Sequence, residues 1–268
     1  MSKIQRKFGI NVDGLRDVDP VEVLTSVKAA GFEAITLQHR DRALTAAVKE
    51  RADELCMEFP FIHAPFAGIN SLWLAGMEYL TILERIKDTI DSAAELGIPY
   101  VITHVSSGWN APAVTDLGLA RFDELVLYAR GKGVILAFEN LRMLGNLAYL
   151  IDRYEHMDNV RFCFDCGHEH CYTKTVRWLD IFTHKVVATH IHDNHSRTFE
   201  DKVSDGDEHL LPFDGTYDYA PMMQRLDEYG YEGVLLLEIS NRKAEYRHLT
   251  TEEFLATAYE RIKRISEL

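Results

Sequence analysis

VILAFEN (residues 134–140) and VRFCFDCGHEH (residues 160–170) are two apolar, strand-like runs that each lead into a carboxylate. Glu139 ends the first run and Asp165 ends the second. The pattern returns in VVATHIHDN (186–194), which carries His190, and in GVLLLEIS (233–240), which carries Glu238. An unpaired buried charge is costly, so packing alone does not explain a charged or ligand-type residue at the end of each run. The repetition predicts a shared site at one rim of a sheet or barrel.

Apolar strand-like runs alternate with amphipathic helical stretches along the whole chain. The predicted strands are Phe8–Val12, Ala34–Gln38, Phe61–Ala64, Tyr100–Val105, Val134–Glu139, Arg161–Asp165, Val186–His192 and Val234–Ile239. Their continuous apolar character indicates a parallel sheet buried on both faces. Eight such units predict one α/β domain over residues 1–268, a (β/α)8 TIM barrel with its active site at the C-terminal ends of the strands. The alternative is an open doubly wound sheet, although no G-x-G-x-x-G motif follows the first strand.

The composition narrows the class of protein. A formal net charge of −13 argues against nucleic acid as a partner, because binding a phosphate backbone needs clustered Lys and Arg. No apolar stretch reaches the roughly 18 residues of a membrane span, and the start, MSKIQRKFGINV, lacks a signal-peptide pattern. We therefore expect a cytoplasmic protein without a membrane segment, acting on a small molecule. A homo-oligomer is compatible with these features.

The four cysteines include a Cys163-x-x-Cys166 pair that resembles a redox or zinc motif. Successive side chains of a strand alternate between its two faces, so these two thiols should point to opposite sides. No second thiolate pair follows at ligand spacing. We expect the pair to have a structural or incidental role.

Metal-ligand residue types stand at the ends of six successive predicted strands: His63, His104, Glu139, Asp165, His190 and Glu238. The loop after the sixth strand adds His168, and the long loop 194–218 adds Asp207 and His209. Each residue alone is explained by an ion pair or by a hydrogen-bonded histidine, but together they predict a metal site. Two Glu, one Asp and one His suit Mn²⁺, Mg²⁺, Co²⁺ or Zn²⁺ and exclude a soft thiolate site.

These motifs resemble those of the xylose isomerase-like TIM-barrel superfamily. They are HAPF (63–66), AFEN (137–140), FDCGH (164–168), HIHDN (190–194), DEHLLPFDG (207–215) and LLLEI (235–239). The superfamily includes sugar and sugar-phosphate isomerases and epimerases, and also the endonuclease IV type of apurinic nuclease. The resemblance covers most of the chain, from His63 to Glu238, and specifies the superfamily better than the individual activity.

The two branches imply different metal sites. The isomerase and epimerase branch implies one divalent cation on Glu139, Asp165, His190 and Glu238, with His168 facing the substrate. The nuclease branch implies a multinuclear zinc site that uses His63, His104 and a bridging Glu139 for one zinc, Asp165, His190 and Glu238 for a second, and His168, Asp207 and His209 for a third. Every one of these positions holds a ligand type in this chain.

The favoured function is a metal-dependent isomerase or epimerase of a sugar, sugar phosphate or polyol. Glu139 and Glu238 would serve as the acid/base pair for proton abstraction next to a carbonyl, and His168 would hydrogen-bond a substrate oxygen. The metal would stabilise the enediolate as a Lewis acid. Alternatives are a dehydratase or lyase on an inosose- or dehydroshikimate-like substrate, an endonuclease IV-like zinc phosphodiesterase, and a non-catalytic sugar-binding barrel.

Further candidates for substrate contact follow the strand ends. Arg197, after the seventh strand, could clamp a substrate oxygen or a phosphate. Trp109, Phe66 and His39 could cover a sugar face, with packing between loops as the competing interpretation. Asn11 ends the first strand and could contact the substrate or orient a ligand through a hydrogen bond.

Overall fold

The computed structural model describes residues 4–198 and 205–268 of the chain. Its strands are β1 (Phe8–Asn11), β2 (Ala34–Thr36), β3 (Phe61–His63), β4 (Tyr100–Thr103), β5 (Ile135–Glu139), β6 (Val160–Asp165), β7 (Val186–His190) and β8 (Leu235–Leu237). The α-helices are α1 (Leu24–Ala30), α2 (Arg42–Glu54), α3 (Tyr79–Leu96), α4 (Asp116–Lys132), α5 (Leu144–Arg153), α6 (Cys166–Tyr172), α7 (Trp178–Phe182), α8 (Tyr219–Glu228) and α9 (Thr251–Ser266). Short 3-10 helices are η1 (Val12–Gly14), η2 (Ile69–Trp73), η3 (Thr183–Lys185) and η4 (Ala244–Tyr246). Within the predicted loop 194–218, residues 199–204 lie outside the described residues.

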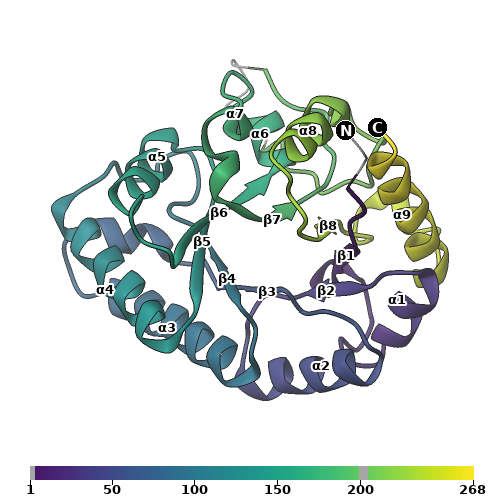
Figure 1. The fold of residues 1–268 in the computed structure, drawn as a ribbon, viewed down its shortest axis with the longest axis horizontal. Helices are drawn as coiled ribbons and strands as arrows, with labels where there is room; N and C mark the ends of the chain where they lie inside the picture. The colour runs from purple at the N-terminus through teal and green to yellow at the C-terminus, as the bar shows by residue number, and fades with distance from the viewer. Residues whose placement is uncertain (1–3, 199–204) are drawn as a thin grey trace.

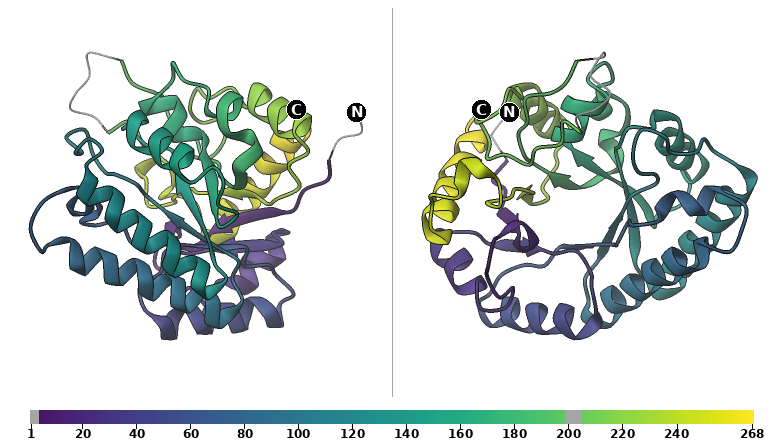
Figure 2. Two further views of the ribbon diagram at one scale, coloured as in Figure 1. Left: turned by 60° about the vertical axis from the view of Figure 1, so that its left-hand side comes forward. Right: turned by 180° about the vertical axis from the view of Figure 1, so that it is seen from behind.

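The strands close into a parallel barrel that the helices surround (Figure 1). Hydrogen bonding orders the strands as β2-β1-β8 and as β3-β4-β5-β6-β7. Parallel bridges from Gln38 to His63 and from Ile191 to Leu237 join the two groups at both edges. The last helix, α9, packs beside α1 (Figure 2), so the first and last units of the chain meet. The predicted (β/α)8 barrel is confirmed, and the open doubly wound alternative is wrong.

Two separate apolar clusters follow from the alternation of side chains along each strand. The barrel interior is filled by Ala34, Phe61, Ile102, Ala137, Cys163, Ala188, Val234 and Leu236. The intervening strand residues, such as Phe138, pack outward in the larger cluster that also contains the buried faces of the helices. Cys163 belongs to the interior cluster and Cys166 to the outer one, so the predicted opposite orientation of these thiols is confirmed.

The same alternation places the ligand-type residues at the barrel mouth. Each stands two positions after an interior residue and therefore points inward one layer higher, at the C-terminal end. The pairs are Phe61 with His63, Ile102 with His104, Ala137 with Glu139, Cys163 with Asp165, Ala188 with His190 and Leu236 with Glu238. The site thus forms the top layer of a packed barrel interior.

The long helices begin and end where their sequence signals stand. Thr115 caps the start of α4 by accepting a hydrogen bond from the Gly118 N–H. Gly133, the residue after the helix, is its C-cap and has φ of 72°. Helix α9 starts with a capping box between Thr250 and Glu253. None of the helices in residues 4–198 and 205–268 is long and apolar enough to cross a membrane.

Candidate functional site

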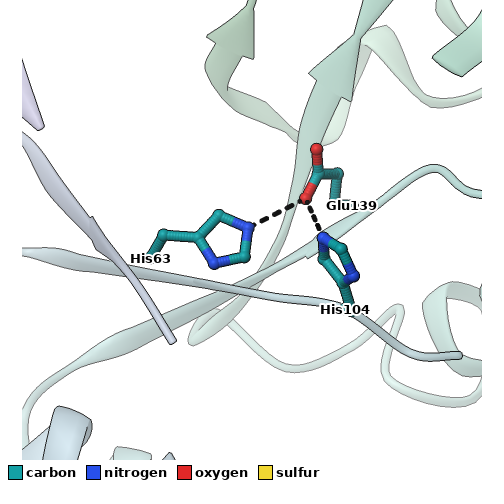
Figure 3. Close-up of side chains that lie close together, drawn as sticks. All are labelled: His63, His104 and Glu139. Atoms are coloured by element: carbon teal, nitrogen blue, oxygen red, sulfur yellow. Dashed lines mark hydrogen bonds and ion pairs between the residues drawn. The ribbon is translucent and has the colours of Figure 1, made fainter. Parts of the chain in front are cut away.

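Glu139, at the end of β5, is the central carboxylate of the site and is fully buried. Its Oε2 lies 3.2 Å from His63 Nε2 and 3.1 Å from His104 Nε2, and both rings point toward this oxygen in Figure 3. Its Oε1 lies 2.9 Å from His190 Nδ1. The carboxylate therefore joins side chains from β3, from the residue that follows β4, and from β7.

A second group shares this carboxylate and holds the four predicted ligands, Glu139, Asp165, His190 and Glu238. One donor atom from each lies within 4.8 Å of all the others. His190 Nδ1 also lies 3.3 Å from Glu238 Oε2. Within the described residues, the buried Oδ2 atom of Asp165 has no hydrogen-bond partner and has only the Nδ1 atoms of His168 and His190 nearby, at 3.6 and 3.8 Å. A buried anionic oxygen without a hydrogen bond is rare unless it serves a ligand. Three carboxylates and one imidazole around this atom fit a divalent cation.

Asp207 brings together the remaining predicted ligands, which line the same cavity as Glu139 and Glu238. Its Oδ2 lies 3.2 Å from His168 Nε2 and 3.2 Å from His209 Nε2. The ring of His168 is held in place because its Nδ1 donates to the Asn140 carbonyl at 3.0 Å. The fold thus brings together every ligand type that the strand-end pattern and the long loop predicted.

His192 is a member of this cluster that the sequence interpretation missed. Its Nε2 lies 3.2 Å from Asp165 Oδ1 and 3.6 Å from Asp207 Oδ1, and its ring stacks on His209 with centroids 4.2 Å apart. The signal was present in the HIH triplet, because residues two apart on an extended segment share a face. His190 pointed inward, so His192 had to do so as well.

Gly167 is required where α6 passes His192. A Cβ atom at this position would lie 1.9 Å from the His192 ring. We expect Gly167→Ala to lower the free energy of unfolding by about 1–3 kcal/mol through overpacking and to reduce metal content. Urea denaturation and elemental analysis measure the two effects. Gly145→Ala is the matched control, since nothing lies within 4 Å of its added Cβ. Equal stability of the two variants would contradict this prediction.

The carboxylates and imidazoles of the cluster shift one another's pKa values. Burial would raise the pKa of Glu139, but the imidazoles of His190 and His104 hold that pKa well below its usual value. Burial would likewise raise the pKa of Asp207, and His209 and His168 keep it well below the usual range. Burial alone would lower the pKa of His209, yet Asp207 raises it to about 10. The carboxylates of Glu139 and Asp207 are therefore ionised and attract positive charge. A divalent cation would compete with the imidazole protons, because only a neutral imidazole binds metal.

A cavity of about 210 Å³ opens above these side chains. The cluster residues other than Asp165 and His192 line it, together with Asn11, Asp13, Thr36, Leu37, Gln38 and Phe66. Asn11 uses its Oδ1 to accept the Ile239 N–H at 3.0 Å, which ties the end of β1 to the segment after β8. Asp13 was not predicted, although it stands two residues after Asn11; burial raises the pKa of its carboxyl.

The other predicted substrate contacts lie elsewhere. His39 is held by Thr45 Oγ1 at 2.9 Å and by Asp88 Oδ2 at 3.0 Å, and it does not line the cavity. The structure does not bring His39 to the site, because groups on α2 and α3 hold both ring nitrogens. Trp109 and Arg197 line a second cavity beside α6.

The amino-acid sequence matches a known protein family. The family model described as xylose isomerase-like TIM barrel matches residues 24–263. The chain belongs to this family. The predicted resemblance to xylose isomerase-like barrels is thereby confirmed. A curated relative is an uncharacterised protein of Methanocaldococcus jannaschii, 24% identical over 217 residues that span 75% of this chain and 71% of the relative.

Solved structures of xylose isomerase-like barrels share the whole fold. A D-tagatose 3-epimerase-like protein superposes with a TM-score of 0.72 at 22% identity, covering 97% of both chains. The 3-keto-D-glucoside 4-epimerase of E. coli superposes with a TM-score of 0.71 at 15% identity, covering 98% of this chain and all of the other. At these identities the likeness shows the common fold.

Proposed function

We propose that this xylose isomerase-like barrel is a divalent-metal-dependent isomerase or epimerase of a small sugar or polyol. The observation that carries the proposal is the meeting of Glu139 and Glu238 at His190, 2.9 and 3.3 Å from its Nδ1. These carboxylates come from β5 and from the residue after β8, with β6 and β7 between them. The epimerase names of the structural neighbours support the same reaction class.

Each residue has a role in this reaction. Mn²⁺, Mg²⁺, Co²⁺ or Zn²⁺ held by Glu139, Asp165, His190 and Glu238 would supply a Lewis acid for two adjacent substrate oxygens. Because Glu139 and Glu238 approach from different strands, one carboxylate can take the proton next to the carbonyl, and the other, in its protonated form, can give its proton to the opposite face. His168, with Nδ1 fixed by the Asn140 carbonyl, would donate from Nε2 to a substrate oxygen.

The dimensions and charge of the site support a small substrate. A cavity of about 210 Å³ is below the roughly 300–1,000 Å³ of drug-sized ligand pockets. The net charge of −13 disfavours a long polyanion such as nucleic acid. A monomeric carbohydrate or polyol meets both conditions.

Glu238→Gln tests the acid/base assignment. We expect exchange of solvent deuterium into the substrate, measured by NMR on ketoses and ketose phosphates in D2O, to fall about 10²–10⁴-fold, as for the loss of a general acid or base. Glu232→Gln, on the exposed turn before β8, is the matched control. Full exchange activity in Glu238→Gln, with unchanged metal content, would refute the assignment.

A second candidate is a zinc phosphodiesterase with several metal ions. It is favoured by the separate grouping of His63, His104 and Glu139, and by the acids and histidines around Asp207. Elemental mass spectrometry on protein purified without added metal distinguishes the two. About one divalent ion per chain supports the isomerase, whereas two or three zinc ions would require an assay on abasic-site DNA.

A dehydratase would use the same residues with a different outcome. Proton abstraction next to the carbonyl would then be followed by loss of a β-hydroxyl as water, with a protonated side chain serving as the acid. The products distinguish the reactions, because an epimer keeps the substrate mass and a dehydrated product loses the mass of one water. Mass spectrometry on inosose and dehydroshikimate incubations therefore decides between them.

A further inference from the structure

A second, larger cavity lies beside the metal-ligand cluster. Its volume is about 550 Å³, and it is lined by Trp109, Asn110, Cys171, Tyr172, Lys174, Thr175, Arg197 and Thr198. Helix α6 contributes to both cavities, since His168 lines the first and Tyr172 lines the second. The rings of these two residues stack with centroids 5.2 Å apart. A substrate bound at His168 would therefore have this cavity next to it.

Arg197 and Lys174 line this cavity, and a second arginine, Arg142, lies over the rings of two lining residues, Trp109 and Tyr172. The Arg197 guanidinium lies 3.7 Å above the Trp109 ring, and the Arg142 guanidinium lies 3.6 Å above the Tyr172 ring. The Lys174 ammonium donates to the Arg197 carbonyl at 2.8 Å. Stacking on an aromatic face orients a guanidinium and leaves its N–H groups free to bind in its plane.

Several of these donors lack a partner. Nε and Nη1 of Arg197, and Nε of Arg142, are buried and have no hydrogen-bond partner among residues 4–198 and 205–268. Arg142 is also paired with Asp205, whose side chain is 65% exposed. Buried charged donors without acceptors are costly, so three such atoms beside one aromatic ring favour an anionic ligand. In a chain of net charge −13, this concentration of cations is not explained by overall composition.

We propose that this cavity binds the anionic group of the substrate, so that the substrate is a sugar phosphate or a sugar acid. The inference rests on the proposed function, because it takes the reacting end of the same molecule to lie at His168 and Glu139. The planar guanidinium of Arg197 matches the oxygen pairs of phosphate and carboxylate groups. Arg197 is therefore the residue that selects an anionic substrate.

Equilibrium binding to the full chain loaded with Mn²⁺ tests this selectivity, because the readout is an affinity and does not require a reaction. The probes for calorimetry are D-fructose 6-phosphate, the sugar acid 5-keto-D-gluconate and uncharged D-fructose. We expect at least one anionic probe to bind about 10–100-fold more tightly than D-fructose, as charge-assisted hydrogen bonds allow. The probe that shows the preference identifies the group as phosphate or carboxylate.

Arg197→Gln should remove the preference for an anionic probe. Arg197→Lys should keep part of it, because lysine retains the positive charge but lacks the paired N–H donors of the guanidinium. Arg153→Gln is the matched control, since Arg153 pairs with Asp123 on the outer surface. Equal affinity for all three probes, or an undiminished preference in Arg197→Gln, would overturn the inference. Metal content and deuterium exchange are measured separately, so a failure of the isomerase reaction leaves the anion preference as an independent result.

Discussion

Glu139→Gln is expected to abolish stoichiometric metal binding and to lower deuterium exchange by about 10³-fold or more. Among the described residues, Glu139 belongs to two of the four groups that could hold a metal ion, and it contacts His63, His104 and His190 within 3.2 Å. Its replacement therefore removes a ligand and a candidate base in one step, and loss of a general base alone costs about 10²–10⁴-fold. Elemental mass spectrometry and NMR exchange measure the two losses.

Glu124→Gln provides the matched control for this substitution. Glu124 is on α4 and pairs with Lys87 at 2.6 Å on the outer surface, so its replacement removes the same charge far from the site residues. We expect metal content and exchange to stay at the level of the unmodified protein. A full equivalent of metal in Glu139→Gln would show that Glu139 is not a ligand.

Phe138→Ala is expected to lower the free energy of unfolding by about 3–5 kcal/mol, as for truncation of a buried aromatic residue. Phe138 is fully buried and packs between strand β5 and the helices, with Phe122 and Tyr154 as aromatic neighbours at centroid distances of 5.8 and 6.3 Å. Urea denaturation of the metal-free protein measures the loss.

The matched control for Phe138 is Leu127→Ala on helix α4. The Leu127 side chain is 59% exposed, so its truncation should change stability by no more than about 0.5 kcal/mol. Equal destabilisation in the two variants would contradict the division into an outer apolar cluster and a solvent-facing helix surface. Because residues 138 and 139 are adjacent on β5, the two substitutions separate packing from chemistry within one strand.

The positions of the ligand-type residues at the strand ends could be predicted because two local rules coincide. An apolar run of strand length identifies a barrel strand, and a polar ligand type at its end identifies the inward layer at the C-terminal rim. Glu139, Asp165 and His190 obey both rules. His192 obeys the alternation rule too. It was not predicted because His190, two positions earlier, already supplied a ligand type at the end of that strand.

His39 shows what strand alternation decides and what distant partners add. It stands five residues after the interior Ala34 and therefore points outward, whereas His63 stands two residues after the interior Phe61 and points inward. Thr45 on α2 and Asp88 on α3 bind the His39 ring, and Asp88 lies 49 residues away in sequence. Alternation gives the direction of this side chain, and only the tertiary structure shows which groups hold it.

By itself the sequence determined the barrel and the inward direction of its ligand-type residues, because strand alternation and strand–helix order are properties of neighbouring residues. Only the tertiary structure decided that Glu139 is shared by two ligand groups, that Asp207 reaches His168 and His209, and that the guanidinium of Arg197 stacks on Trp109. Those contacts join side chains from different strands and loops. Their distances are set by barrel closure, which depends on all the strands together.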